Sequence, residues 1–520
     1  MRRFNITGTC YPQHHYMVNI DDRLNSIAKL VAEGQYITIN RGRQYGKTTT
    51  LYHLKKRMSG DYVVFSISFE DFNGNDFKNE NTLAYSFLEA LRTELEEGTT
   101  EADEIVFKTI DDILKANSEK REVIKVDFSK LIVSICRNSS KPIVLFIDEV
   151  DNASNYDSFI ELLRLLRNKY LKREDIPTFQ SVILAGVYDI KNLKLKVRPD
   201  SDHQYNSPWN IAEKFDERMS FSADQIAQML SDYEADHNTG MNINEIASLI
   251  YDYTSGYPFL ASALCKLIDE KKLGWNLNGV LEAVKIILVE DNTFFDDLIK
   301  KLDDYPQMNT MLKEILYYGN SIPFNIDNKI INISRMFNYI DNNNGRVKIS
   351  NRIIETRLYN KFMSDEKLAG IYREGDTDRN MFIDGKTLKM DKILERFAVH
   401  FNDIYGSKDL TFKEEEGRRF FMLYIRPIIN GTGHYYIEAE TRDRSRTDMI
   451  IDYNGVQYII EMKIWRGESY NERGENQLSE YLDYYHIDKG YMLSFCFNKN
   501  KVSGGKTIQI GDKEIYEVVV

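Results

Sequence analysis

Cysteine, proline and long apolar runs are all scarce in this 520-residue chain. The four cysteines, Cys10, Cys136, Cys265 and Cys496, have no CxxC or CxxxH neighbour, so their spacing supports neither a disulfide framework nor a zinc site. The longest apolar runs have the length of a core strand, and the N-terminus has no apolar signal segment. We therefore expect a cytoplasmic protein without a membrane span.

The composition also disfavours disorder. Hydrophobic residues make up 42% of the chain and charged residues 28%, with nine prolines, which is typical of folded, helix-rich domains. The net charge of −12 argues against a chain coated with nucleic acid, although a local basic groove is compatible with it. The length predicts about three domains.

Short apolar strands alternate with amphipathic helices in the first third of the chain, which predicts a parallel sheet covered by helices. The expected strands are QYITIN (35–40), YVVFSISF (62–69), PIVLFID (142–148) and QSVILAG (180–186). The expected helices are 48–58, 82–97, 103–118 and 157–170.

The stretch NRGRQYGKTTT (40–50) has the ending of a phosphate-binding loop, but Arg41 stands where the general pattern has its first glycine. A strand precedes it and a helix follows, as such a loop requires. Lys47 would reach the β- and γ-phosphates, Thr48 would bind Mg²⁺, and Gly46 would leave room for the phosphates. Gly42 would supply the turn freedom one position late. The competing interpretation is a chance GKT.

A second motif, PIVLFIDEVD, places Asp148 at the carboxyl end of a buried strand, where ligand sites of α/β sheets lie. Asp148 would hold Mg²⁺ through water, and Glu149 would orient or deprotonate the attacking water. A solvated turn after a core strand is the alternative.

Together with SVILAGVYDIKNL, NSPWNIA and SGYPFLASAL, these two motifs resemble the AAA-ATPase-like proteins related to the STAND and archaeal-type ATPases, over about residues 1–365. In that family the loop often reads R-x-R-x-[FY]-G-K-[ST]. The resemblance therefore implies that Arg41, Gly42 and Thr49 belong to the ATP-binding loop. It also implies that Gly256 and Pro258 form a motif that approaches the nucleotide base.

Further candidates at this site are a sensor residue, two arginine fingers and a platform for adenine. The resemblance implies a sensor role for Asp189 and offers Arg198 and Arg218 as arginine fingers. His15 and Tyr16 precede the first helix, where they would form a platform for adenine or serve only in packing.

The sequence RTDMIIDYNGVQYIIEMK (446–463) predicts a β-hairpin, because Asn454-Gly455 is a strong two-residue turn signal. A tight turn places Asp448 opposite Glu461 and Arg446 opposite Lys463. The two facing carboxylates, about 5 Å apart, would repel each other by roughly 3 kcal/mol at an effective dielectric of about 20. A Mg²⁺ or Mn²⁺ ion between them would reverse that sign, and Lys463 would stabilise a pentavalent phosphate.

Period-two alternation divides this hairpin into two faces. One face is expected to be core, and it carries Met449, Ile451, Tyr458, Ile460 and Met462. The other is expected to carry the acidic pair with Asp452, Gln457 and Lys463, and Ile450 and Ile459 fall among them.

This hairpin resembles the PD-(D/E)xK nuclease superfamily over about residues 385–520, with Asp448 as the first acid and Glu461-Met462-Lys463 as ExK. The resemblance implies that Gln477 and Tyr481, on a following helix, also point at the site. Glu440, and one of Glu415 or Glu416, are further candidates for the acidic set. A surface hairpin with a solvated acid pair is the alternative.

The expected fold class is α/β: a P-loop NTPase parallel sheet with a helical lid and a winged helix, followed by a restriction-endonuclease-like α/β domain. The expected divisions are a P-loop ATPase domain (1–222), a helical lid (223–305), a winged-helix-like domain (306–365), a linker (366–384) and a nuclease-like domain (385–520).

Three functions are compatible with the sequence. The first is an ATPase whose nucleotide state controls a metal-dependent nuclease acting on DNA, in host defence or mobile-element processing. The second is an ATP-dependent switch or scaffold whose C-terminal domain binds partners or nucleic acid without cutting. The third is an ATPase with a structural relic at its C-terminus. The expected partners are ATP and DNA, with a homo-oligomer as an expected assembly and no membrane.

Overall fold

The computed structural model describes residues 2–187, 209–215, 219–290, 292–318, 322–365, 381–385, 387–405, 414–429, 433–440, 446–465, 468–497 and 504–520. They form two compact units, each described by itself. The first unit is Met1–Trp275 with Asn332–Tyr339, and the second is Asn276–Ile331 with Ile340–Val520. The five divisions expected from the sequence stay predictions, and Asp189, Arg198 and Arg218 lie outside the described residues.

A five-stranded parallel sheet forms the centre of the first unit, in the order β4-β5-β6-β3-β7. Its strands are β3 (Ile37–Asn40), β4 (Val63–Ser68), β5 (Ile143–Asp148), β6 (Ser181–Gly186) and β7 (Glu213–Lys214). The four expected strands are confirmed, each shorter than expected by one or two residues. The two-residue β7 was not expected.

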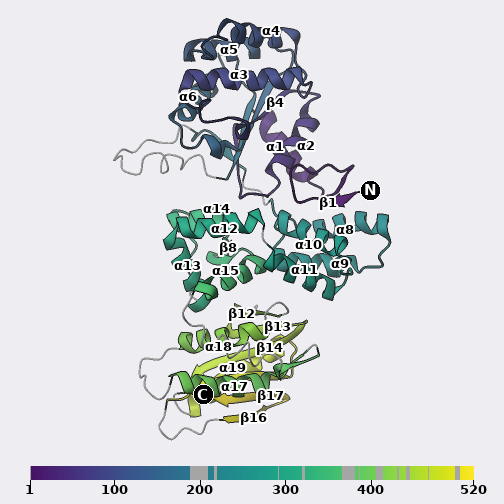
Figure 1. Ribbon diagram of the computed structural model, residues 1–520, viewed down its shortest axis with the longest axis vertical. Coiled ribbons are helices and arrows are strands. Elements are labelled where there is room, and N and C mark those ends of the chain that lie inside the picture. Colours follow the sequence, from purple (N-terminus) through teal and green to yellow (C-terminus); the bar gives the residue numbers. More distant parts are fainter. Residues whose placement is uncertain are drawn as a thin grey trace. The chain divides into compact units, whose positions relative to one another are not determined.

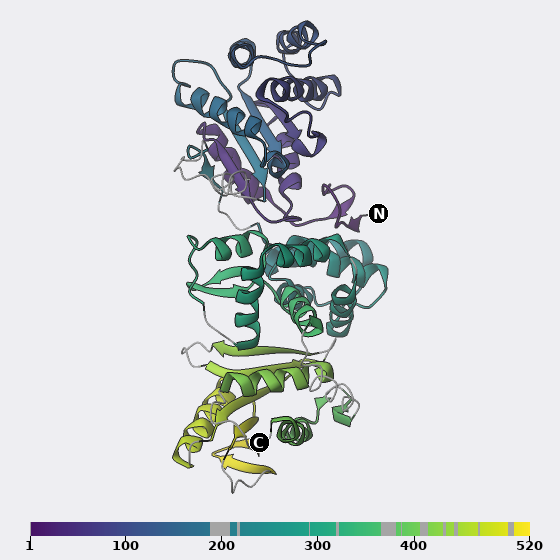
Figure 2. The same ribbon diagram turned by 60° about the vertical axis from the view of Figure 1, so that its left-hand side comes forward.

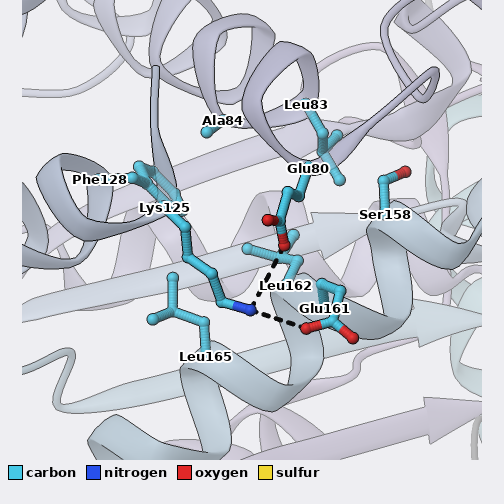
Figure 3. Close-up of a pocket in the computed structure, with 9 residues that line it drawn as sticks. All are labelled: Glu80, Leu83, Ala84, Lys125, Phe128, Ser158, Glu161, Leu162 and Leu165. Atoms are coloured by element: carbon cyan, nitrogen blue, oxygen red, sulfur yellow. Dashed lines mark hydrogen bonds and ion pairs between the residues drawn. The ribbon is translucent and has the colours of Figure 1, made fainter. Parts of the chain in front are cut away.

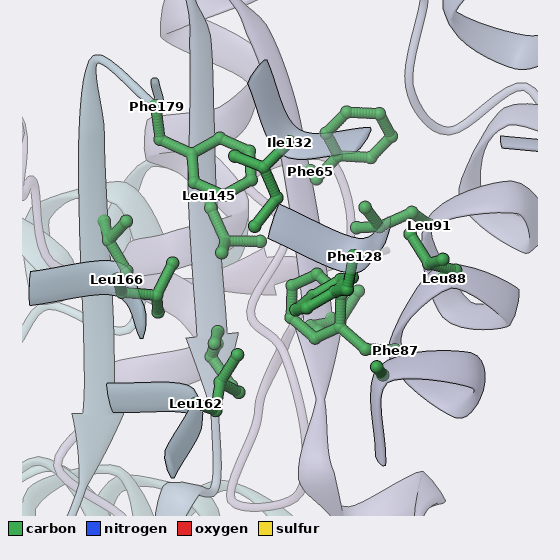
Figure 4. Close-up of a cluster of buried hydrophobic side chains, with 14 of the residues drawn as sticks. Phe65, Phe87, Leu88, Leu91, Phe128, Ile132, Leu145, Leu162, Leu166 and Phe179 are labelled. Atoms are coloured by element: carbon green, nitrogen blue, oxygen red, sulfur yellow. The ribbon is translucent and has the colours of Figure 1, made fainter. Parts of the chain in front are cut away.

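Helices cover both faces of this sheet. Alternate residues of β4 point to opposite sides, so that Val64 packs with one cluster of buried side chains and Phe65 with another. Figure 4 shows part of the cluster that contains Phe65. The Val64 side is covered by α1 (Asp21–Ala32) and α2 (Lys47–Met58). The Phe65 side is covered by α3 (Glu80–Glu96), α4 (Glu104–Ala116), α5 (Lys125–Asn138) and α6 (Asp157–Leu171). Four of these helices were expected, and a first helix after Tyr16 was expected without bounds, whereas α5 was not expected.

The described part of the first unit continues with the helices α8 (Ala223–His237), α9 (Ile243–Thr254) and α10 (Pro258–Glu270). The first of them begins at Ser222, whose side chain forms a capping box with Gln225. Two short N-terminal strands, β1 (Arg3–Phe4) and β2 (His15–Tyr16), pair with each other and contact α10 and α8 respectively. The chain before the central sheet therefore packs on helices that follow it by more than two hundred residues.

The second unit begins with the helices α11 (Leu277–Val289), α12 (Thr293–Asp304) and α13 (Pro306–Tyr318). Next come α14 (Lys329–Met336), which runs from the second unit into the first, the hairpin β8 (Ile340–Asn343) and β9 (Arg346–Ile349), and α15 (Arg352–Asp365). The winged-helix-like domain expected in residues 306–365 stays a prediction.

A six-stranded mixed sheet follows, in the order β12-β13-β14-β15-β17-β16. Its strands are β12 (Gly433–Glu440), β13 (Arg446–Tyr453), β14 (Val456–Ile464), β15 (Lys489–Phe495), β16 (Gly504–Ile510) and β17 (Lys513–Val519). The helix α19 (Glu468–Tyr484) packs on one face through the buried cluster at Leu478, while α17 (Met390–Tyr405) and α18 (Glu414–Ile429) contact the sheet away from that cluster (Figure 1; Figure 2).

The predicted hairpin register is confirmed between Met449 and Tyr453, where Met449 pairs with Ile460 and Tyr453 with Val456. The pairing of Asp448 with Glu461 would continue this register and stays a prediction. The expected division into one core face and one acidic face is wrong, because Ile450 and Ile459 are as deeply buried as their neighbours. They pack beneath α19, which covers the second face.

Within the described residues, none of the helices combines the length and the apolar character that crossing a membrane requires.

Candidate functional site

The predicted phosphate loop follows β3 directly. The Arg41 backbone N–H donates to the carbonyl oxygen of Gly186 at 3.0 Å, which extends the contact between β3 and β6 by one residue. The loop then turns through two residues with left-handed backbone, Gln44 (φ 59°) and Gly46 (φ 78°). Gly46 opens α2, so backbone N–H groups at a helix N-terminus face the loop.

The expectation that Gly42 supplies the turn freedom is wrong, because Gly42 is not among the residues with positive φ. A Cβ atom there would lie 3.3 Å from the carbonyl oxygen of Met336. Gly42 is therefore a point of close packing, and the left-handed turn that it was expected to provide occurs at Gln44.

Lys47 is buried at 4% exposure and lies inside the loop. Its Nζ donates to the carbonyl oxygens of Arg41 and Gly42, at 3.2 Å each. Neutral carbonyl oxygens hold this ammonium group inside the loop, and a phosphate oxygen can replace them with a stronger hydrogen bond because both partners are then charged. The predicted contact of Lys47 with phosphate requires only this exchange of acceptors, and it stays a prediction.

The two nucleotide motifs meet at Thr48 and Asp148. Thr48 Oγ1 donates to Asp148 Oδ2 at 2.6 Å, and Asp148 Oδ1 accepts the Glu149 backbone N–H at 2.9 Å. These hydroxyl and carboxylate oxygens are the ligand types that Mg²⁺ takes in proteins alongside phosphates and water, so the pair fits the ion.

Glu149 adopts a left-handed backbone with φ of 49° and lies beside Lys47. Burial raises the pKa of its carboxyl, and the negative charges of Asp148 and Asp151 add to the rise. The positive charges of Lys47 and Arg43 oppose it. A carboxyl with a raised pKa is suited to accept a proton from water near neutral pH.

A cavity of about 340 Å³ opens beside the loop, at the lower end of the size range of small-ligand sites. Its polar side is formed by the loop and α2 from Gln44 to Thr50, together with Glu149. Its other side is largely apolar and includes Tyr16, Val18, Ile20, Phe221, Met229, Pro258 and Phe259. One cavity thus combines phosphate-binding groups with an apolar compartment of the kind that a base requires.

Several predicted residues surround this cavity without sharing one role. Pro258 lines it, as does Thr49, whose Oγ1 accepts the Cys10 backbone N–H at 3.2 Å. Gly256 contacts a residue of the lining, since the backbone N–H of Phe221 donates to the Gly256 carbonyl oxygen at 2.8 Å. Tyr16 lines it and donates its hydroxyl to Asp236 at 2.9 Å.

Sequence reasoning missed Arg23 and Glu70, which also line the cavity. Arg23 is buried, and its guanidinium donates to the Met219 carbonyl oxygen at 3.0 Å and to Thr50 Oγ1 at 3.4 Å. Neither residue belongs to a recognisable motif, so only the fold reveals them.

A second hollow, between α3, α5 and α6, is much smaller, at about 20 Å³ (Figure 3). Lys125 bridges two carboxylates across it, with Nζ 2.7 Å from Glu161 and 3.4 Å from Glu80. Arg164 also pairs with Glu161, so that two basic side chains balance the two carboxylates. The hollow has room for no more than about one water molecule. These ion pairs are structural, and the hollow is too small for a ligand-binding site.

In the second unit, the predicted Glu461 and Lys463 contact each other. Glu461 is fully buried, and Lys463 Nζ lies 2.8 Å from its Oε1. Gln477 Nε2 donates to the Tyr481 hydroxyl at 2.7 Å on α19. The side chains of Asp448, Glu440, Glu415 and Glu416 lie outside the described residues.

The described side chains at this second position do not form a complete metal site. Within the described part of the chain, no group of three or more histidine, cysteine, aspartate or glutamate side chains is arranged to hold an ion. Glu461 supplies one carboxylate oxygen donor of the right type, and Lys463 already compensates its charge.

Comparison with known proteins identifies the first two thirds of the chain. The family model described as AAA-like domain matches residues 13–364. The search of curated proteins found no match.

Three solved structures illustrate the structural likeness. The Walker-type ATPase PABY2304 of Pyrococcus abyssi is 12% identical, with a TM-score of 0.47 over 68% of this chain and 99% of that one. The RuvB Holliday junction branch migration motor of Thermotoga maritima is 12% identical, with a TM-score of 0.32 over 67% and 96%. The ORC1 protein of Aeropyrum pernix, in complex with DNA, is 12% identical, with a TM-score of 0.31 over 67% and 94%. Superpositions this loose carry no argument about function.

Proposed function

This chain belongs to the AAA-like domain family, and on that premise we propose that its first unit binds ATP with Mg²⁺ and hydrolyses it. The observation that carries the proposal is the meeting of two distant motifs at one cavity, where Thr48 bonds Asp148 and both Lys47 and Glu149 line the wall. The apolar side of the same cavity offers a compartment for the base.

Each residue then has a defined task. Lys47 exchanges the carbonyl oxygens of Arg41 and Gly42 for phosphate oxygens, and the N–H groups at the start of α2 bind the same phosphates. Thr48 would hold Mg²⁺ directly and Asp148 through water; the ion, when bound, neutralises the phosphate charge. Glu149 orients the attacking water and accepts its proton.

We further propose that the C-terminal sheet is a PD-(D/E)xK nuclease-like domain that acts on DNA with Mg²⁺ or Mn²⁺ under control of the nucleotide state, in host defence or mobile-element processing. The supporting observation is the buried Glu461 with Lys463 on the same strand. Burying a carboxylate costs several kcal/mol unless a partner or an ion compensates it. The hairpin register, continued by one residue, would bring Asp448 to the same place.

The alternative is an ATP-dependent switch or scaffold, in which residues 306–365 form a winged-helix-like partner surface and the C-terminal domain does not cut. It is favoured by the 2.8 Å contact between Glu461 and Lys463, because a structural ion pair would also be closed in this way. The two functions differ in whether DNA cleavage depends on Glu461.

A plasmid-cleavage assay separates them, with Mg²⁺ or Mn²⁺ and with or without ATP. The parent is compared with Lys47→Ala and Glu461→Ala, and Asp452→Asn is the matched control. Asp452 lies on the same hairpin and accepts the Gly455 N–H at 3.2 Å, an acceptor that asparagine retains. We expect cutting by the parent and the control and none by Glu461→Ala.

Nucleotide binding is measured on the same proteins. We expect Lys47→Ala to lose ATP affinity and the ATP response of cutting. A parent that binds ATP but cuts no DNA would leave the switch as the function, and a parent that binds no nucleotide would overturn the ATPase proposal itself.

A further inference from the structure

The phosphate loop holds a residue in an unfavourable conformation at its tip. Gln44 has φ of 59°, and side chains with a Cβ atom seldom adopt this left-handed region. Gln44 also lines the nucleotide cavity. Strained backbone at a ligand site persists only where the surrounding structure holds it.

Two tyrosine hydroxyls provide such support, on the two sides of Gln44. On the N-terminal side, Tyr257 donates to the carbonyl oxygen of Arg43 at 2.5 Å, and this carbonyl belongs to the peptide that enters Gln44. On the C-terminal side, the Tyr45 hydroxyl donates to Asn338 Oδ1 at 2.7 Å. The rings of Tyr45 and Tyr257 contact each other edge to face, 4.6 Å between centroids.

The supporting groups are themselves fixed. Tyr257 and Asn338 are buried, at 2% and 9% exposure. Burial raises the pKa of Tyr257 well above its ordinary value, so its hydroxyl keeps the proton that it donates. Tyr257 immediately precedes α10. Asn338 belongs to the segment Asn332–Tyr339 of the first unit, and the residues before and after this segment in the chain belong to the second unit.

We propose that Tyr257 and Asn338 are positioning residues of the nucleotide site, which hold Gln44 in the left-handed conformation that shapes the loop for phosphate. Left-handed residues turn successive N–H groups toward one concave side, where an anion binds. In this loop, where Arg41 replaces the first glycine of the general pattern, contacts from distant residues fix the turn. The inference rests on the proposed binding of ATP.

The effect on affinity follows from populations. If the loop without one of these hydrogen bonds spends only a tenth of its time in the competent shape, the apparent affinity for ATP falls about tenfold. Glycine has no steric penalty at positive φ, so a chain carrying Gln44→Gly depends less on the support. The role of Tyr257 can therefore be distinguished from ordinary packing.

The experiment measures the dissociation constant of ATP for the full chain in a double-mutant cycle. The four proteins are the parent, Tyr257→Phe, Gln44→Gly and the double variant, with thermal unfolding as the check on folding. We expect Tyr257→Phe to weaken ATP binding about tenfold in the parent chain, which has Gln44, and less than about threefold in the chain that carries Gln44→Gly. Tyr45→Phe, which removes the hydroxyl that bonds Asn338, should repeat the pattern.

Equal factors in the two backgrounds, or no loss in either, would overturn the positioning role while leaving ATP binding intact. A parent that binds no ATP would overturn the proposed nucleotide function and this role with it. Because both phenylalanine variants keep the aromatic ring, a folded variant is expected in each arm.

Discussion

Thr48 Oγ1 donates a 2.6 Å hydrogen bond to Asp148 Oδ2, which joins the phosphate loop to the end of β5 across 100 positions of sequence. Thr48 lies in α2, which follows β3, whereas Asp148 ends β5, and β6 lies between these two strands. Parallel strands end at the same edge of a sheet, and this edge is where the ligand is expected.

The first prediction concerns this pair. Replacement of Thr48 by alanine should weaken binding of ATP in the presence of Mg²⁺ by about 2 kcal/mol, or roughly thirtyfold, because an oxygen ligand is lost. Without Mg²⁺ the change should be small. The measurement is a titration of ATP with and without the ion, and Thr48→Ser is the control because it keeps the hydroxyl. Equal losses under both conditions would assign Thr48 to the helix N-terminus alone.

Glu149 is predicted to be the base for hydrolysis. Its replacement by glutamine should lower the rate of ATP hydrolysis by at least about a hundredfold, and far more than it lowers affinity. The raised pKa of Glu149 also predicts the direction of the pH dependence. Below this pKa the carboxyl is neutral and hydrolysis is lost, whereas hydrolysis increases as the pH rises through the pKa. The midpoint of this rise in hydrolysis rate should therefore lie at a higher pH than the pKa of an ordinary glutamate.

The pH profile of kcat/KM for ATP hydrolysis, which reports the ionisation of the free enzyme, checks this. A limb at the pKa of an unperturbed glutamate, or a Glu149→Gln enzyme with the parental rate, would contradict the assignment.

The strands and the hairpin register could be predicted from sequence because they depend on local patterns. Apolar runs of strand length marked β4 and β5, and Asn454-Gly455 fixed the pairing of Met449 with Ile460. The same local signals failed where tertiary packing decides. The second face of the hairpin is buried because α19 covers it. Ile450 and Ile459 are apolar residues on that face, but the hairpin pattern alone does not show that a helix covers them.

The shape of the phosphate loop was beyond sequence reasoning for the same reason. The missing glycine drew attention to Gly42, the nearest glycine, whereas the left-handed turn occurs at Gln44. The residues that hold this turn, Tyr257 and Asn338, lie more than two hundred positions away. A pattern read along the chain cannot show which distant hydroxyl reaches a loop carbonyl.

Gly256 should be the least replaceable glycine of the first unit. Its φ is 73°, and a Cβ atom added to it would lie 1.8 Å from the carbonyl oxygen of Phe221. Gly256→Ala therefore combines an unfavourable dihedral with a backbone clash, and should destabilise the unit by more than about 3 kcal/mol. It should also displace Phe221 from the nucleotide cavity and so weaken ATP binding.

Gly98 offers the matched control, because its φ of 68° is nearly the same and nothing lies within 4 Å of an added Cβ. Gly98→Ala should cost only the dihedral term, about 1 kcal/mol, without an effect on ATP. Denaturant unfolding of both variants measures the difference. Equal losses of stability would show that Phe221 gives way and that the close approach is unimportant.

Glu355 on α15 should make the second unit less stable as pH rises. Burial raises the pKa of this carboxyl to about 7, although Arg352, Lys348 and Arg426 oppose the rise. Because the folded pKa exceeds the unfolded value of 4.5, the folded state binds the proton more tightly. No penalty exists below about pH 4.5; it grows as the unfolded chain ionises, and it is complete above about pH 7.

Glu355→Gln removes this titration, so the difference in Tm between variant and parent should increase from pH 4.5 to pH 7 and then stay constant. Taking the difference cancels every other group that titrates in this range. A difference that decreases with rising pH would mean that the three basic side chains overcome the burial of Glu355, and that its folded pKa lies below the unfolded value.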